Sequence, residues 1–182
     1  KLLEKAENYK REEDTYFVTD LCYCLKKREF YMKYSYMQKT LYLRAPIIIG
    51  TLLHEGIHSF LEEELLFEVS KNKIVKHYDI RGRIDALDTI NRVGYEFKFS
   101  QQGGLRDQYI LQAMIYNWLF DLSKTILLYV TPERITEYEV SGKLTDEEVV
   151  KLILDSRSPK YPWECNYCVF KSLCPKKRSN SR

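Results

Sequence analysis

The sequence has few glycines and prolines and no long apolar segment. Its 182 residues include seven Gly and five Pro, with 45% hydrophobic and 30% charged residues, which excludes collagen-like, low-complexity and disordered classes. The longest apolar run, residues 45–50, is far shorter than the roughly 20 residues that cross a bilayer. No signal-peptide pattern opens the chain, and the missing initiator Met indicates a trimmed N-terminus. We therefore expect one cytoplasmic domain over residues 1–182 that does not bind membranes.

Cysteine is missing from the long middle part of the chain. Cys22 and Cys24 lie near the start, and Cys165, Cys168 and Cys174 follow about 140 residues later. An odd number in two groups does not fit the disulfide framework of a secreted protein. The late group lacks a fourth thiolate, which has to come from Cys24 or Cys22. A structural zinc site and an iron–sulfur cluster both use four thiolates, and unrelated buried thiols are the third possibility.

The apolar periodicity predicts a mixed α/β core. Helices are expected over residues 20–36, with Thr19 as N-cap, and over 46–67, 105–122 and 145–154, the last started by a capping box at Thr145 and Glu148. A β-hairpin is expected over residues 75–88 and 93–100, followed by strands over 124–131 and 134–140. Residues 156–162 are expected to form a linker and residues 176–182 a mobile basic tail.

Two carboxylates face each other in the expected hairpin. If Asp88 pairs with Val93, Asp85 lies opposite Glu96, with Cβ atoms roughly 4.5 to 5.5 Å apart. Like charges in this position destabilise a sheet, and the simplest compensation is a divalent cation, which carboxylate oxygens suit. Lys98 lies two residues beyond Glu96 on the same face, where its ammonium could stabilise charge that develops during phosphoryl transfer. A solvated strand face with alternating charges is the simpler alternative.

The segment His54-Glu55-Gly56-Ile57-His58 matches the pattern of two histidines and a glutamate in zinc proteases. The third zinc ligand would have to be one of four later acids, Glu62, Glu63, Glu64 or Glu68. A protease does not explain the Asp85 and Glu96 pair, so we prefer His54 alone as a metal ligand beside these two carboxylates. His58 would then support the site or pack nearby, and a structural role for both histidines is the remaining alternative.

Three polar residues recur along one side of the otherwise apolar helix expected over 105–122. Gln108, Gln112 and Tyr116 lie at positions i, i+4 and i+8. A buried amide and a buried phenol need hydrogen-bond partners, which the wall of an active site would supply. A solvent-facing stripe fits the same periodicity.

Basic and aromatic residues alternate between residues 26 and 44. The net charge of the chain is only +3, but basic side chains gathered in this segment could follow the phosphates of DNA while tyrosines stack on unpaired bases. The candidate DNA contacts are Lys26, Lys27, Arg28, Lys33 and Tyr36. A solvated helix face is the alternative.

Five motifs in this order resemble the CRISPR-associated exonuclease family of the RecB nuclease superfamily, over roughly residues 18–175. They are Gly50-x3-His54, Gly82-Arg83-Ile84-Asp85, Glu96-Phe97-Lys98, Gln112-x3-Tyr116 and the split set of one early and three late cysteines. The resemblance implies a restriction-endonuclease-like nuclease core over residues 45–155. It also implies a four-iron, four-sulfur (4Fe-4S) module, made of residues 19–36 and 156–175, that joins the two ends of the chain.

The resemblance implies a role for each motif residue. His54, Asp85, Glu96 and the Phe97 carbonyl would bind Mg²⁺ or Mn²⁺. Lys98 would be the catalytic lysine, with Gln112 and Tyr116 as the accessory pair. The cluster ligands would be Cys24, Cys165, Cys168 and Cys174. Leu25 stands where the family usually has Pro, so Cys22 stays open as the alternative to Cys24.

The activity that the resemblance implies is 5′-to-3′ hydrolysis of single-stranded DNA. Such trimming would prepare DNA ends for the CRISPR integrase complex, the implied partner. The alternatives are a DNA-repair or viral nuclease of the same superfamily, a DNA-binding module without catalysis, and the zinc protease.

Overall fold

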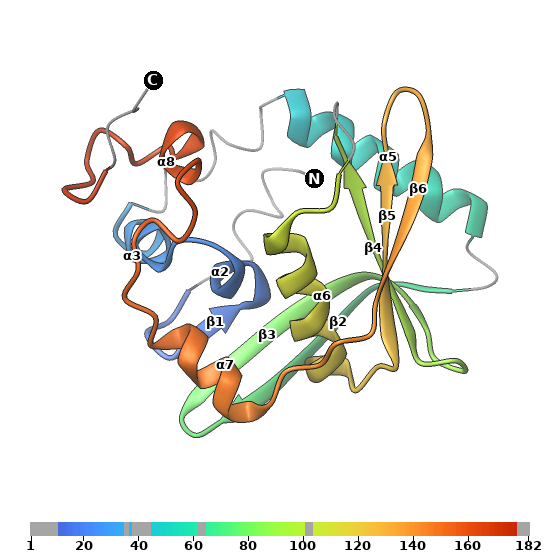
Figure 1. Cartoon of the computed structure of the whole chain (residues 1–182), viewed down its shortest axis with the longest axis horizontal. Helices are drawn as coiled ribbons and strands as arrows, with labels where there is room; N and C mark the ends of the chain where they lie inside the picture. The colour runs from blue at the N-terminus through green and yellow to red at the C-terminus, as the bar shows by residue number, and fades with distance from the viewer. Residues whose placement is uncertain (1–10, 35–36, 38–44, 62–64, 101–103, 178–182) are drawn as a thin grey trace.

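The computed structural model describes residues 11–34, 37, 45–61, 65–100 and 104–177 (Figure 1). Within these ranges the strands are β1 (Thr15–Phe17), β2 (Leu66–Val75), β3 (Tyr78–Asp88), β4 (Val93–Phe99), β5 (Lys124–Val130) and β6 (Ile135–Val140). The helices are α2 (Val18–Cys22), α3 (Leu25–Lys33), α5 (Ala45–Leu61), α6 (Asp107–Phe120), α7 (Asp146–Ile153) and α8 (Glu164–Tyr167). The expected mixed α/β architecture is confirmed. None of the described helices has the length and apolar character needed to cross a membrane.

The six strands form one mixed sheet in which β3 is the central and longest element. Strands follow the order β1, β3, β4, β5, β6, and β2 also pairs with β3. Because β2 pairs antiparallel with β3 along nearly its whole length, β1 and β4 share the opposite edge of β3. β1 pairs with residues 79–81 and β4 with residues 86–88. The edge of β3 between them, residues 82–85, therefore has no strand partner among the described residues.

The core lies between the sheet and α6, which carries apolar side chains on most of its surface. Ile80 and Ile84 of β3 are completely buried together with Leu21 of α2 and Ile115 of α6. Gly82 is needed at this contact, because a Cβ there would lie 2.6 Å from the Leu119 side chain and 2.9 Å from that of Val18. Figure 1 shows α5 passing behind β4, β5 and β6, whereas α6 lies beside α2.

Several predicted boundaries hold and others do not. The helix at α6, strands β5 and β6, and helix α7 with its Thr145–Glu148 capping box are confirmed. The helix expected over 46–67 ends at Leu61, and strand β2 (Leu66–Val75) begins inside the last residues of that range and continues through a segment for which no element was predicted. The hairpin prediction also missed that β2 turns into β3 at residues 76–77. Lys76 adopts a left-handed φ of 57° there, without the glycine that usually marks such a turn.

The helix expected over 20–36 is wrong in two respects. It starts at Val18, so Thr19 is not the N-cap; the Asp20 carboxylate accepts a hydrogen bond from the Phe17 amide at 3.1 Å instead. It is also broken at Tyr23 and Cys24 into α2 and α3.

The break in this helix lets the two ends of the chain meet. The buried Glu164 carboxylate accepts hydrogen bonds from the Cys24 amide at 2.7 Å and from the Tyr161 amide at 2.8 Å. Lys160 donates to the Leu21 carbonyl at 2.6 Å, and the Phe170 ring stacks on Phe30 with centroids 5.4 Å apart. Figure 1 shows α3 and α8 on the same side of the molecule. Of the expected basic tail, only residues 176–177 are among those described.

Candidate active site

The site forms where β3 and β4 separate. The predicted register is confirmed by the pairs Asp88–Val93 and Ala86–Tyr95. The ladder ends there, however, so the expected pairing of Asp85 with Glu96 is wrong. The Asp85 carboxylate accepts a 2.7 Å hydrogen bond from the Phe97 amide. The Asp85 side chain thus takes the place of a ladder bond where β3 and β4 separate around an opening.

One side of this opening holds a group that suits a metal ion. His54 of α5, Glu68 of β2 and Asp85 of β3 each place a ligand atom within 4.8 Å of the other two. The His54 Nδ1 atom lies 3.6 Å from the Asp85 carboxylate, and His54 Nε2 lies 3.3 Å from the Phe97 carbonyl. An imidazole with carboxylate and carbonyl oxygens is a donor set for Mg²⁺ or Mn²⁺.

Glu96 is the most buried carboxylate of the site. One of its oxygens accepts hydrogen bonds from the Lys98 ammonium at 2.6 Å and from the Gln112 amide at 2.8 Å. The other oxygen, Oε2, has no hydrogen-bond partner within the described chain. Burying a carboxylate oxygen without a partner costs folding free energy. A bound cation would supply the missing partner.

Gln112 and Tyr116 lie in the wall of this opening. This agrees with the prediction that the polar side of the helix lines an active site. The Tyr116 phenol donates to the Arg83 carbonyl at 2.8 Å and lies 3.3 Å from the Gln112 amide. The carbonyl of Arg83 belongs to the unpaired edge of β3, so Tyr116 provides the hydrogen bond that a neighbouring strand would otherwise supply. Gln108 is also buried, but its amide nitrogen has no partner in the part of the chain described.

Burial and mutual repulsion set the charges of the site. Burial raises the pKa of Asp85 to about 6, and burial together with the Asp85 charge raises the pKa of Glu96 to about 7. Burial alone would lower the pKa of Lys98, but the Glu96 and Asp85 charges outweigh it and raise that pKa above its usual value. Burial lowers the pKa of His54, which favours the neutral imidazole that ligates metals.

These shifts predict how metal binding depends on pH. Protons compete with the cation for Asp85 and Glu96, so we expect the increase in Tm on adding MnCl₂ to be small near pH 5 and to grow as pH rises through about 6 to 7. Without metal, the folded state holds protons that the unfolded state releases. The contribution of this pair to stability therefore falls with rising pH between the unfolded and folded pKa values. Thermal unfolding with MnCl₂ or EDTA across this range checks the prediction, and an equal Tm increase at every pH contradicts it.

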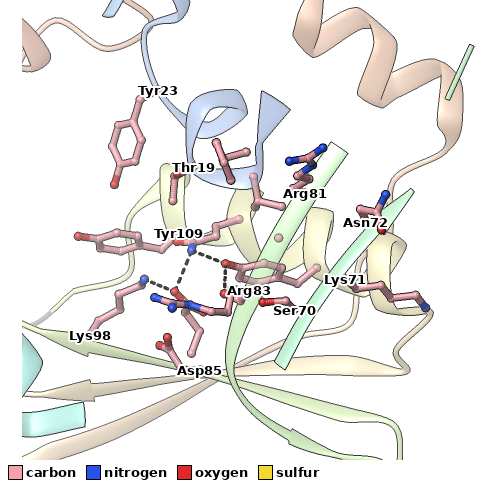
Figure 2. A pocket seen from close by; sticks show the side chains of 16 residues that line it. Thr19, Tyr23, Ser70, Lys71, Asn72, Arg81, Arg83, Asp85, Lys98 and Tyr109 are labelled. Carbon is pink, nitrogen blue, oxygen red and sulfur yellow. Dashed lines mark hydrogen bonds and ion pairs between the residues drawn. The ribbon is translucent and has the colours of Figure 1, made fainter. Parts of the chain in front are cut away.

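The carboxylates line one end of a long groove. The groove encloses about 830 Å³, and its lining includes Asp85, Glu96 and Lys98 together with Tyr23 and Tyr109. Figure 2 shows Lys98, Asp85 and Tyr109 at one end, and Arg81, Asn72 and Lys71 at the other. The Lys98 ammonium lies 4.9 Å from the centre of the Tyr109 ring. An open groove of this volume can accommodate part of a polymer next to the carboxylates.

The cysteines of the two ends line a second, smaller cavity of about 80 Å³. Cys24 from the segment between α2 and α3 meets Cys165, Cys168 and Cys174 there. Cys22 does not line this cavity. It is completely buried in the core beneath α6, and burial raises the pKa of its thiol to about 12. The geometry favours Cys24 over Cys22 as the fourth member of the set.

Three predicted DNA contacts lie away from the groove. Lys26 and Lys27 line the cysteine cavity, and Lys26 also pairs with Glu29. Lys33 lies over the Tyr34 ring, 5.4 Å from its centre. Tyr36 lies outside the described residues.

Arg28, the remaining predicted DNA contact, has a structural role. It is 5% exposed, and its guanidinium donates to the backbone carbonyls of Glu12, Glu13 and Thr15 at 2.7 to 2.8 Å. The guanidinium also stacks over the Tyr16 ring at 3.9 Å. With its donors used in this way, Arg28 is not part of the DNA surface that we propose below.

We expect the Arg28→Ala variant to lose about 3 kcal/mol of unfolding free energy, since hydrogen bonds from a charged donor contribute about 1.5 to 3 kcal/mol and buried carbonyls lose their partner. Urea unfolding measures this value. The matched Lys33→Ala variant removes a surface cation and is expected to change stability by less than about 0.5 kcal/mol. Equal stability of the two variants would contradict the structural role of Arg28.

Glu68, which the sequence suggests only as a zinc-protease ligand, joins the metal-binding group of the nuclease site. Glu68 has a left-handed φ of 54° and pairs with Arg83 at 2.8 Å. Its position depends on the pairing of β2 with β3, which was not predicted. His58 does not join the His54 group: its ring lies 4.2 Å from that of Phe67. The other candidate protease ligands, Glu62, Glu63 and Glu64, lie outside the described residues.

Comparisons with known proteins extend the argument from the site to the whole chain. No protein-family model matches the sequence. The chain is 34% identical over 194 aligned residues to the CRISPR-associated exonuclease Cas4 of Saccharolobus solfataricus, covering 97% of this chain and 95% of that protein. The crystal structure of SSO0001 matches with a TM-score of 0.92 at 33% identity, covering 98% of this chain and 94% of that one.

A more distant structure shares the fold. The alkaline exonuclease of Laribacter hongkongensis matches with a TM-score of 0.54 at 12% identity, covering 78% of this chain and 83% of that one. The full-length likeness to a CRISPR-associated exonuclease overturns the zinc-protease alternative and makes the chain a nuclease. With the site, the fold and this full-length identity in agreement, the chain belongs to the Cas4 family of CRISPR-associated exonucleases.

Proposed function

We propose that this chain is a metal-dependent exonuclease that trims single-stranded DNA in the 5′-to-3′ direction, in the cytoplasm. The observation that carries the proposal is that Asp85, Glu96 and Lys98 line an open groove, with ligand atoms of His54 and Glu68 within 4.8 Å of Asp85. The name of the relative, a CRISPR-associated exonuclease, supports a role in preparing DNA for the CRISPR integrase complex during spacer acquisition.

The residues of the site fit a divalent cation. Glu96 Oε2 is buried without a protein partner in the described chain, and the neighbouring donors are imidazole, carboxylate and carbonyl groups. His54, Asp85, Glu96 and the Phe97 carbonyl would hold Mg²⁺ or Mn²⁺. When bound, such a cation polarises a phosphate oxygen and lowers the pKa of a bound water.

The protein side chains divide the remaining work. The Lys98 ammonium would stabilise the negative charge that develops on the phosphate during attack by water. Gln112 would hold the carboxylate of Glu96 in place through its 2.8 Å hydrogen bond, and Tyr116 would fix the Arg83 carbonyl. Both would therefore act as positioning residues, because they touch other groups of the site.

We also propose that the cysteine cavity holds a 4Fe-4S cluster. Its four thiols, from Cys24, Cys165, Cys168 and Cys174, are the donor set that such a cluster and a zinc site share. The same donor set suits a zinc site, and the visible absorption of the protein distinguishes the two.

A cleavage assay on the purified protein tests this function. End-labelled single-stranded and double-stranded DNA are incubated with Mn²⁺, Mg²⁺ or EDTA, and the visible absorption of the protein is recorded. We expect metal-dependent loss of nucleotides from single-stranded 5′ ends and the colour of an iron–sulfur protein. Progressive loss from 3′ ends overturns the polarity, and cleavage that persists in EDTA overturns the metal site.

A further inference from the structure

The groove continues well beyond the catalytic groups. From Asp85 it runs along β3 past Arg83 to Arg81 and is bordered by Lys71 and Asn72 of β2. Figure 2 shows Arg81, Asn72 and Lys71 at the end opposite Lys98, whereas the Arg83 side chain reaches toward Lys98 and Asp85. Apart from Asp85 and Glu96, every charged residue of the lining is basic, namely Lys71, Arg81, Arg83 and Lys98. The groove therefore leads from a basic floor to the metal site.

Arg81 is held in place for binding an anion. Asp79 accepts a hydrogen bond from Arg81 Nε at 2.7 Å, and its other oxygen accepts one from the Asn72 amide at 3.0 Å. This leaves both terminal nitrogens of the guanidinium without a partner in the described residues, and the Arg81 side chain is 46% exposed. Arg83 differs, because it pairs with Glu68. A guanidinium fixed at Nε and open at its two terminal nitrogens suits a phosphate group.

We propose that Arg81, oriented by Asp79 and Asn72, binds a backbone phosphate of the DNA substrate away from the cleaved bond. Arg81 precedes Asp85 by four residues on a strand, which places the two about 13 Å apart along β3. At a rise of about 3.4 Å per nucleotide, this separation spans up to about four nucleotides. The inference rests on the proposed DNA substrate and adds a second point of contact that fixes the path of the strand.

The variant Arg81→Gln tests this contact, because its amide can still reach Asp79 while the charge is lost. The matched control is Arg157→Gln. Arg157 also pairs with an aspartate two residues earlier, Asp155, at 2.7 Å, but does not line the groove. Binding of a fluorescent sixteen-nucleotide oligothymidylate is measured in EDTA at several salt concentrations. Each phosphate contact to a single strand contributes about 0.7 to the slope of log K against log salt.

We expect Arg81→Gln to lower that slope by about 0.7 and Arg157→Gln to leave it unchanged. In Mn²⁺, Arg81→Gln should raise the KM for the same oligonucleotide about tenfold with little change in kcat, and should leave hydrolysis of the dinucleotide dTpdT unaffected. Equal slopes and KM values for the two variants overturn the proposal. It is also overturned if Arg81→Gln slows hydrolysis of dTpdT as much as it slows hydrolysis of the longer oligonucleotide. A lower slope in a protein that cleaves no DNA supports this contact and overturns the proposed nuclease activity on single strands instead.

Discussion

Replacing Glu96 by Gln is expected to abolish metal-dependent cleavage while leaving the metal-free protein at least as stable as the wild type near pH 8. Gln keeps the shape of the side chain, so Gln112 and Lys98 can still contact it. It removes a charge that the cation needs, and loss of electrostatic stabilisation of this kind lowers kcat by a factor of about 10³. The Tm increase caused by MnCl₂ should fall with it.

The expected stability has an electrostatic cause. The buried group contains two carboxylates, Asp85 and Glu96, and one ammonium, Lys98. Burial raises the pKa of Glu96 to about 7, so ionised Glu96 lowers the stability of the metal-free fold above that pH. The Gln variant leaves one carboxylate and one ammonium, a balanced pair.

The matched control for Glu96 is Glu139→Gln. Glu139 also pairs with a lysine, Lys124, at 2.7 Å, but on the surface. We expect this variant to cleave DNA like the wild type and to lose less than about 1 kcal/mol. Metal-dependent cleavage by Glu96→Gln at more than about a tenth of the wild-type rate would contradict the assignment of the metal site.

Replacing Cys24 by Ala is expected to remove the visible absorption of the protein and lower its Tm by about 10 °C. Cys24 would supply the thiolate from the N-terminal end, and its loss removes the link through the proposed cluster while the contacts of Glu164, Lys160 and Phe170 remain. A loss of about 3 kcal/mol corresponds to this shift, because each kcal/mol moves Tm by about 2 to 4 °C in a domain of this size. Absorption spectra and thermal unfolding measure both effects.

Cys22→Ala is the control for the cysteine prediction. Cys22 is completely buried among apolar residues and is absent from the cavity that the other four line. Its replacement leaves only a small void, so we expect a cost of about 1 kcal/mol and full absorption. Loss of colour in Cys22→Ala with colour retained in Cys24→Ala would make Cys22, and not Cys24, the fourth cluster ligand.

The sequence predicts the elements whose signals are local. The capping box at Thr145 and the apolar surface of α6 each appear within a few residues, and both are confirmed. The break at Cys24 is different, because its amide is bound by Glu164, which is 140 residues away in the sequence. No periodicity within residues 20–36 reports such a partner.

The site shows the same division between local and distant causes. The hairpin register at Asp88 and Val93 was predictable from the alternation of residues. The placement of Lys98 on the same strand face as Glu96 follows from that register. The separation of β3 and β4 was not predictable, because it depends on Tyr116 and Asp85 replacing ladder bonds. Arg28 was predicted to contact DNA because of its charge. Its burial depends on hydrogen bonds to the backbone of residues 12–15, which the sequence pattern does not reveal.

The contact between Cys24 and the late cysteines also affects when the protein can mature. Protein synthesis delivers the N-terminal part of a chain first, at about 5 to 20 residues per second. Cys24 therefore leaves the ribosome well before Cys165, Cys168 and Cys174, which share its cavity. The four thiols can assemble only after almost all of the nuclease core has emerged. Loading of the proposed cluster would thus be a late event, possible only in chains that extend through Cys174.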